Sequence, residues 1–174
     1  HRPANSRILA AGLFGVVTLA SFNDAFSQGG KSQAMNPALA RTLIEARKAL
    51  GDGLPQVAAV KASRLLTAQG LSEKEKAEIA SVAVEAWIRA RDGAKAQELM
   101  AQHEVEDEAF WAAHVLVLEG DLNAATTAFG KHASMGDKAD DAHLALAYVL
   151  MADGREGTAR TELKEVRTSK DPVI

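Results

Sequence analysis

The sequence predicts an all-α fold made of three to four antiparallel helical hairpins. Alanine is abundant throughout the chain, and it is the residue that favours helix most strongly. Aromatic residues make up only 5% of the chain, and the β-branched residues do not form the alternating runs that are typical of strands. Apolar residues instead recur at helical spacing in short segments separated by glycine or aspartate. These three observations favour helices that pack on helices.

The composition excludes several classes of protein. The 174 residues carry a formal net charge of -3, whereas a nucleic-acid-binding domain is typically basic. The chain has no cysteine, which excludes disulfides, thiolate zinc sites and the lipid attachment of a bacterial lipoprotein. A single domain of this length can bury enough surface to fold without such supports.

Residues 1–27 are similar to a secretory signal peptide. Arg2 and Arg7 precede an apolar stretch at residues 8–20, and the segment ends in Ala25-Phe26-Ser27, which has small residues one and three places before the expected cut. We therefore expect export to the periplasm or to the outside of the cell. The alternative is an uncleaved anchor through residues 8–26, but the apolar residues 8–20 would span as a helix only about 20 Å of a hydrocarbon core of about 30 Å.

The rest of the chain divides at its capping residues. Residues 28–36 read as a flexible spacer, because they are rich in glycine and polar residues. Asn36-Pro37 is typical of a helix start, and Asp171-Pro172 stops the last helix. We therefore predict one helical repeat domain over residues 37–169 and a tail at residues 170–174.

Four segments share a pattern that indicates hairpin turns. They begin at Gly53, Arg91, Gly120 and Gly154, and an alanine follows each of these residues five positions later. A capping box at Ser72–Glu75 precedes the helix that enters the second turn. Short breaks between helices of this length predict antiparallel neighbours.

The third segment resembles the core motif of the tetratricopeptide repeat (TPR) family, in its exported bacterial type. Gly120-Asp121-Leu122, Ala125 and Phe129 have the spacing of that motif, and Gly120 and Gly154 are 34 residues apart, which is the TPR period. The resemblance covers residues 39–167 and implies a right-handed α-solenoid. In it, small residues lie where paired helices touch, at Ala46, Val84, Ala113 and Ala147. The other turn intervals are 38 and 29 residues, and a generic array of hairpins is the alternative.

No pattern of residues indicates chemistry. His103, His114, His132 and His143 lie in different predicted helices without a metal-ligand spacing. The chain has neither a nucleophile elbow nor a phosphate-binding loop, and its carboxylates are spread over helix faces. We therefore predict a protein that is not an enzyme and that has no cofactor and no metal.

The TPR resemblance implies a concave surface that is lined by the first helix of each hairpin. It places eight residues there: Ser81, Glu85, Arg89, Asp107, Phe110, His114, Leu144 and Tyr148. Such a groove suits an extended peptide or a partner helix, and it predicts a protein-binding scaffold or adaptor in the bacterial periplasm. The alternative for Phe110 and Tyr148 is the core between hairpins, where we also expect Trp87 and Trp111.

Other functions remain open on the sequence alone. One is a periplasmic chaperone or small-ligand carrier with a pocket between helices. Another is an accessory subunit of an envelope complex, which would contact the membrane only if residues 8–26 stay attached. Self-association through the first hairpin is also possible, because three to four hairpins are close to the minimum that buries a shared core.

Overall fold

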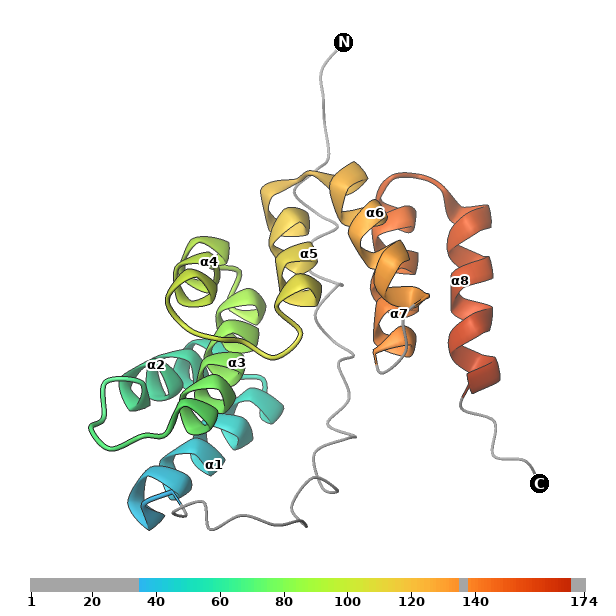
Figure 1. Cartoon of the computed structure of the whole chain (residues 1–174). Coiled ribbons are helices and arrows are strands. Elements are labelled where there is room, and N and C mark those ends of the chain that lie inside the picture. Colours follow the sequence, from blue (N-terminus) through green and yellow to red (C-terminus); the bar gives the residue numbers. More distant parts are fainter. Residues whose placement is uncertain (1–34, 135–137, 170–174) are drawn as a thin grey trace, which may run out of the picture. The chain divides into compact units, whose positions relative to one another are not determined.

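The computed structural model describes residues 35–134 and 138–169, and all regular structure in them is α-helical (Figure 1). The predicted all-α class is confirmed. The helices are α1 (Pro37–Gly51), α2 (Pro55–Leu65), α3 (Glu73–Arg89), α4 (Gly93–Gln102), α5 (Glu108–Glu119), α6 (Leu122–Ala133), α7 (Ala139–Ala152) and α8 (Glu156–Ser169). The predicted signal peptide, the first part of the spacer and the tail lie outside the described residues.

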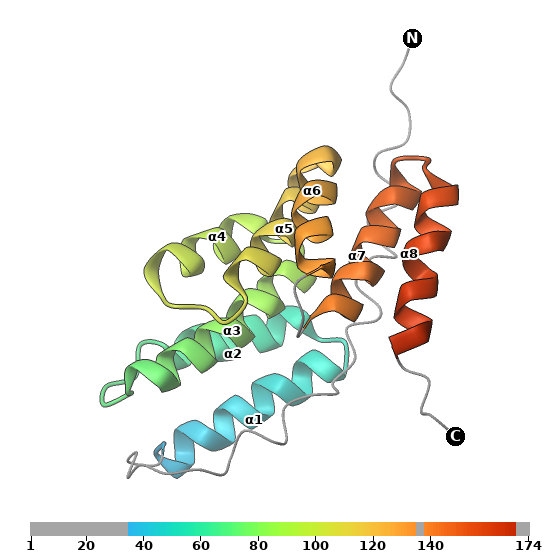
Figure 2. The same cartoon turned by 45° about the vertical axis from the view of Figure 1, so that its right-hand side comes forward.

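The helices belong to two compact units of two hairpins each. The first unit contains α1 to α4 and the second contains α5 to α8. In the first, each helix packs on the next one in sequence, and α1 also contacts α3 (Figure 2). In the second, α5 packs on α6, α6 on α7 and α7 on α8. Most helix contacts within each unit are therefore between helices that follow one another in the sequence.

Helix starts follow the capping residues that the sequence predicted. The side chain of Asn36 accepts a hydrogen bond of 2.9 Å from the Ala38 backbone N–H, and Pro37 occupies the first turn of α1. At α3 the backbone N–H of Glu75 donates to Ser72 Oγ, and the Ser72 N–H donates to Glu75 Oε2 at 2.7 Å. The capping box is therefore complete in both directions.

The four predicted turns share one backbone conformation. In each, a residue at the end of the first helix has a positive φ: 76° at Gly53, 64° at Arg91, 84° at Gly120 and 77° at Gly154. Gly120 is itself the cap of α5, whereas the other three residues follow the cap. The next residue closes the turn by donating its backbone N–H to a carbonyl of the preceding helix: Leu54 to Ala49 at 2.9 Å, Asp92 to Trp87 at 2.9 Å, Asp121 to Leu116 at 3.0 Å and Arg155 to Leu150 at 2.8 Å. This is the Schellman motif, in which glycine is the usual left-handed residue.

The residues that the TPR resemblance assigns to the contact between paired helices are buried. Those of the second helices are buried: Ala58, Ala96, Ala125 and Ala159. Those of the first helices are buried as well: Ala46, Val84, Ala113 and Ala147. Small side chains let paired helices approach closely, which explains the regular hairpin geometry.

Helix lengths account for the unequal turn intervals. The long interval contains α3 with 17 residues, whereas the short one contains α4 with 10 residues and α5 with 12. The interval with the TPR length contains α6 with 12 residues and α7 with 14. The hairpins therefore repeat their turns and contact positions but not their lengths.

Candidate functional site

The residues predicted for a concave surface fall into two groups, one in each unit. Ser81, Glu85 and Arg89 lie on α3, in the first unit. The other five belong to the second unit: Asp107 precedes α5, Phe110 and His114 lie on α5, and Leu144 and Tyr148 lie on α7.

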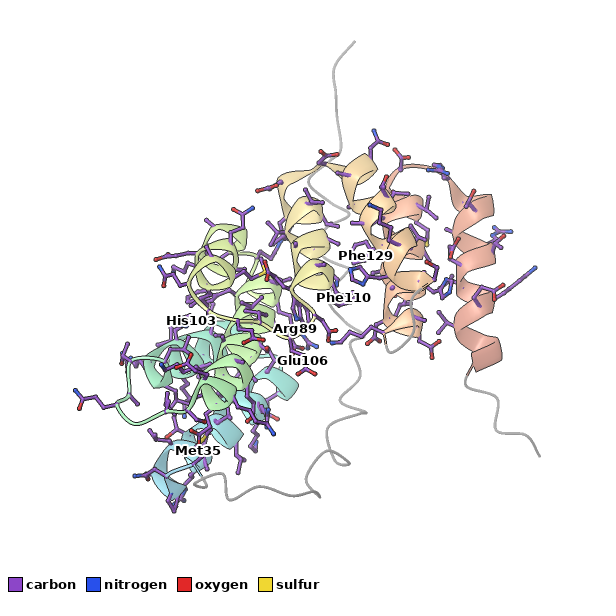
Figure 3. All side chains as sticks on the ribbon, in the orientation of Figure 1. Met35, Arg89, His103, Glu106, Phe110 and Phe129 are labelled. Carbon is purple, nitrogen blue, oxygen red and sulfur yellow. The ribbon has the colours of Figure 1, made fainter. Side chains whose placement is uncertain are left out.

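The three residues on α3 make contacts within their own unit. Ser81 Oγ donates to the Ala77 carbonyl at 2.9 Å and accepts the backbone N–H of Glu106 at 2.9 Å. Arg89, which Figure 3 shows on α3, pairs with Glu85 at 2.6 Å. These side chains hold the end of the unit together, which leaves less of their hydrogen-bonding capacity for a partner.

Phe110 and His114 are interior residues of the second unit. Phe110 is 1% exposed and His114 is 3% exposed. The Phe110 ring lies 4.8 Å from that of His114 and 5.7 Å from that of Phe129 on α6, in edge-to-face geometry (Figure 3). Trp111 joins this cluster at 5.2 Å and is buried, as expected. Phe110 is therefore a core residue, as in the alternative that the sequence left open for it.

The remaining members of the second group lie at the edges of this cluster. Asp107 has a left-handed backbone with φ of 56°, and its carboxylate lies 3.2 Å from the ammonium of Lys138. That ammonium also lies over the rings of Phe110 and Trp111, at 5.3 and 5.1 Å from their centroids. Leu144 and Tyr148 are half-buried on α7.

One stretch of exposed apolar surface in the first unit lies elsewhere, at the N-cap of α2 and along that helix. Leu54, Val57 and Val60 are 52%, 45% and 40% exposed, and their spacing of three residues places them along one strip. We call these three residues the α2 strip. None of them is among the residues that the sequence predicted for a binding surface. The sequence does contain a sign of this exposed strip. The buried stripe of α2 is formed mostly by small residues, Ala58, Ala59 and Ala62, together with Leu65, so the larger valines fall on a different side of the helix.

The α2 strip leads into a hollow of about 610 Å³ that is open to solvent. Gln56 and Val60 of α2 line one side, and Trp87, Ala90 and residues 91–95, which include the start of α4, line the other. We call it the α2–α4 hollow. Trp87 donates its indole N–H to Ser63 on α2 at 3.1 Å, which fixes the orientation of the ring. The expectation that Trp87 is wholly a core residue was therefore too simple, since one part of it lines the hollow.

The charges around the hollow are only partly balanced. Lys61 lies 2.7 Å from Glu45, and Lys95 lies 3.2 Å from Asp92. The hydrogen bond from Lys61 lowers the pKa of Glu45, and the backbone N–H of Lys95 lowers the pKa of Asp92, so that both carboxylates are charged at neutral pH. Each of these two lysines therefore has an acidic neighbour.

Arg64 and Arg91 have no such neighbour among the residues that the structure describes. Both side chains are exposed, and neither makes an ion pair or a side-chain hydrogen bond within the described residues. Arg91 lines the hollow directly. Arg64 is four residues beyond Val60 on α2, so it lies on the same side of the helix as the end of the strip. The surface that combines the α2 strip with the hollow therefore carries two positive charges that are unpaired within residues 35–134 and 138–169.

Arg91 also differs from the residues at the three equivalent turns. It has a φ of 64° at a position where the other hairpins have glycine. A Cβ placed on Gly53, Gly120 or Gly154 would meet nothing within 4 Å, so space does not require glycine there. The left-handed backbone is what favours glycine at these positions, because this conformation disfavours side chains with a Cβ. The chain therefore keeps a strained arginine at the mouth of the hollow.

Comparison with protein-family models, with curated proteins and with solved structures finds no match to this chain. What the structure itself defines is a class: an all-α protein of repeated helical hairpins. In the described residues no three His, Asp or Glu side chains gather as metal ligands do. None of the helices described is long and apolar enough to cross a bilayer.

Proposed function

We propose that this protein is a non-catalytic scaffold that binds a protein or peptide partner through its helical hairpins. The observation that carries the proposal is the α2 strip, where two valines of α2 and the leucine at its N-cap are exposed at a spacing of three residues. Contiguous apolar surface beside a hollow is typical of interaction sites. The rigid hairpin beneath it presents these side chains in a fixed geometry, which lowers the entropic cost of binding.

The proposal includes a TPR-like, right-handed arrangement of the hairpins and export to the periplasm. The four equal turns and the small residues at both contact positions support the repeat. The expectation of export depends on the sequence of residues 1–27. We place the binding surface on α2 and the α2–α4 hollow, because Ser81, Glu85 and Arg89 are engaged in contacts within their unit.

The experiment is a selection of peptides from a random library on the immobilised full chain, followed by affinity measurement on single peptides. Val57→Asp combined with Val60→Asp should weaken binding at least tenfold, because it places charge on the apolar strip. The matched control is Ile44→Asp, which changes an apolar residue that is 64% exposed on α1. It should leave binding unchanged, and circular dichroism should show that all variants are folded.

Two results would overturn the proposal. One is a selection that enriches no peptide. The other is a set of enriched peptides that bind the double variant as well as the original chain. A dimer that the double variant dissociates would assign the α2 strip to self-association instead, and light scattering measures this directly.

A further inference from the structure

We infer that the partner segment is acidic, and that one of its carboxylates binds Arg91 at the mouth of the α2–α4 hollow while its apolar side chains cover the α2 strip. This inference depends on the proposed function and names the chemistry of its partner. It follows from charge complementarity, from the lining of the hollow and from the backbone of Arg91.

Charge complementarity selects a carboxylate. Of the cations around the surface, Lys61 and Lys95 already have acidic neighbours at 2.7 and 3.2 Å. Arg64 and Arg91 have none in the described part of the chain. They flank an apolar strip, so the matching ligand carries bulky apolar side chains and carboxylates together. A guanidinium binds a carboxylate through two parallel hydrogen bonds, which gives orientation as well as attraction.

The lining of the hollow favours a side chain that enters beside Trp87. Lys95 covers the indole ring at 4.0 Å from its centroid, and the ring nitrogen is already bonded to Ser63. Val60 and Ala90 supply the neighbouring apolar surface. A partner residue inserted there meets apolar atoms along its stem and a cation at its end. Glutamate, or a chain-terminal carboxylate after an apolar residue, fits this lining.

The backbone of Arg91 is the independent observation. Three of the four turns within the described hairpins have glycine at the left-handed position. The fourth has Arg91 there. Glycine would form the same turn with less strain, since the closing hydrogen bond from Asp92 to Trp87 involves the backbone alone. Strained residues of this kind cluster at binding sites, where their side chains have a role that offsets the strain.

Arg91→Gly therefore separates binding from folding. The variant should fold at least as well as the original chain, so a loss of binding cannot come from unfolding. Peptides selected on the full chain from a random library should be enriched in Asp and Glu next to apolar residues. Their affinity should fall about tenfold in Arg91→Gly, as expected for the loss of one charge-assisted contact.

The control is Arg155→Gln, which removes the same charge beside a different hairpin turn and should change the affinity less than twofold. The affinity of Arg91→Lys should lie between that of the original chain and that of Arg91→Gly, because lysine keeps the charge without the planar pair of donors. Raising the salt concentration should lower the peptide affinity of the original chain more than that of Arg91→Gly.

The outcomes separate this inference from the proposed function. Enriched peptides without acidic residues, or acidic peptides that bind Arg91→Gly equally well, would overturn the inference. If those peptides still lost affinity with Val57→Asp and Val60→Asp, the α2 strip would remain a binding surface for a partner of different charge. Absence of any enriched peptide would overturn both.

Discussion

The ammonium of Lys95 lies over the indole ring of Trp87, 4.0 Å from the ring centroid. The same nitrogen lies 3.2 Å from Asp92 Oδ2, and the Asp92 side chain accepts the backbone N–H of Lys95 at 3.1 Å. One lysine thereby connects the end of α3, the turn and the start of α4. The contact covers one face of a tryptophan that the hollow would otherwise expose.

This contact predicts that Lys95→Met lowers the free energy of unfolding by about 0.5–1 kcal/mol, as expected for a cation–π contact at a partly exposed ring. Methionine keeps the apolar stem and removes the charge. Lys48→Met is the control, because Lys48 also pairs with an aspartate, at 2.6 Å from Asp52. Urea unfolding of both variants measures the difference, and equal losses would mean that the ring contributes nothing.

A second prediction concerns the left-handed turns. Arg91→Gly should raise the free energy of unfolding by about 0.5–1 kcal/mol, because glycine adopts a positive φ without the Cβ penalty. Gly120→Ala should lower it by about 1–2 kcal/mol for the converse reason, since φ there is 84° and the added Cβ has open space. Chemical denaturation tests both changes. A shift of the same sign in the two variants would contradict the strain argument.

A third prediction tests the close contact inside the third hairpin. Ala125 is fully buried on α6, so Ala125→Leu should overpack the contact and cost about 1–3 kcal/mol. Thr127→Leu, at an exposed position of the same helix, should stay within about 0.5 kcal/mol of the original chain. Thermal melts of both variants compare them directly. An unchanged melting temperature for Ala125→Leu would exclude tight packing at this position.

The fourth prediction is the pH dependence of the α3 cap. Hydrogen bonds from Ser72 lower the pKa of Glu75, so the cap stabilises the fold above the ordinary glutamate pKa and loses this contribution as the pH falls through the lowered value. Ser72→Ala should cost about 1 kcal/mol at neutral pH. The gap between the two chains should narrow in acid, where Glu75 is protonated. Urea unfolding at several pH values measures it, and a gap that widens in acid would have the wrong sign.

Much of the fold was predictable because the hairpin turns have recognisable residues in the sequence. The residues at 53, 91, 120 and 154, and the alanines five positions later, are local features that act within one hairpin. Each of those turns has a positive φ, and each alanine is buried. The caps at Asn36 and Ser72 are equally local, since their partners lie two or three residues away. Local chemistry of this kind can be read directly from spacing.

The candidate site was less predictable because it depends on which face of each helix remains uncovered. The TPR resemblance placed Phe110 and His114 on a surface, whereas the aromatic rings of α5 and α6 enclose them. Conversely, the expectations from the sequence did not include Val57 and Val60. They are exposed because alanines fill the narrow contact between α1, α2 and α3. The sequence does not state which of two apolar faces a neighbouring helix will cover.

The order of helix contacts has a consequence for how the chain folds. In each unit, consecutive helices pack on each other, and the closing hydrogen bond of every hairpin spans only five residues. Contacts this close in sequence require little loop closure before they form, so hairpins of this type assemble rapidly. Each hairpin can therefore begin to form as soon as its second helix has left the ribosome, before the rest of the chain is present.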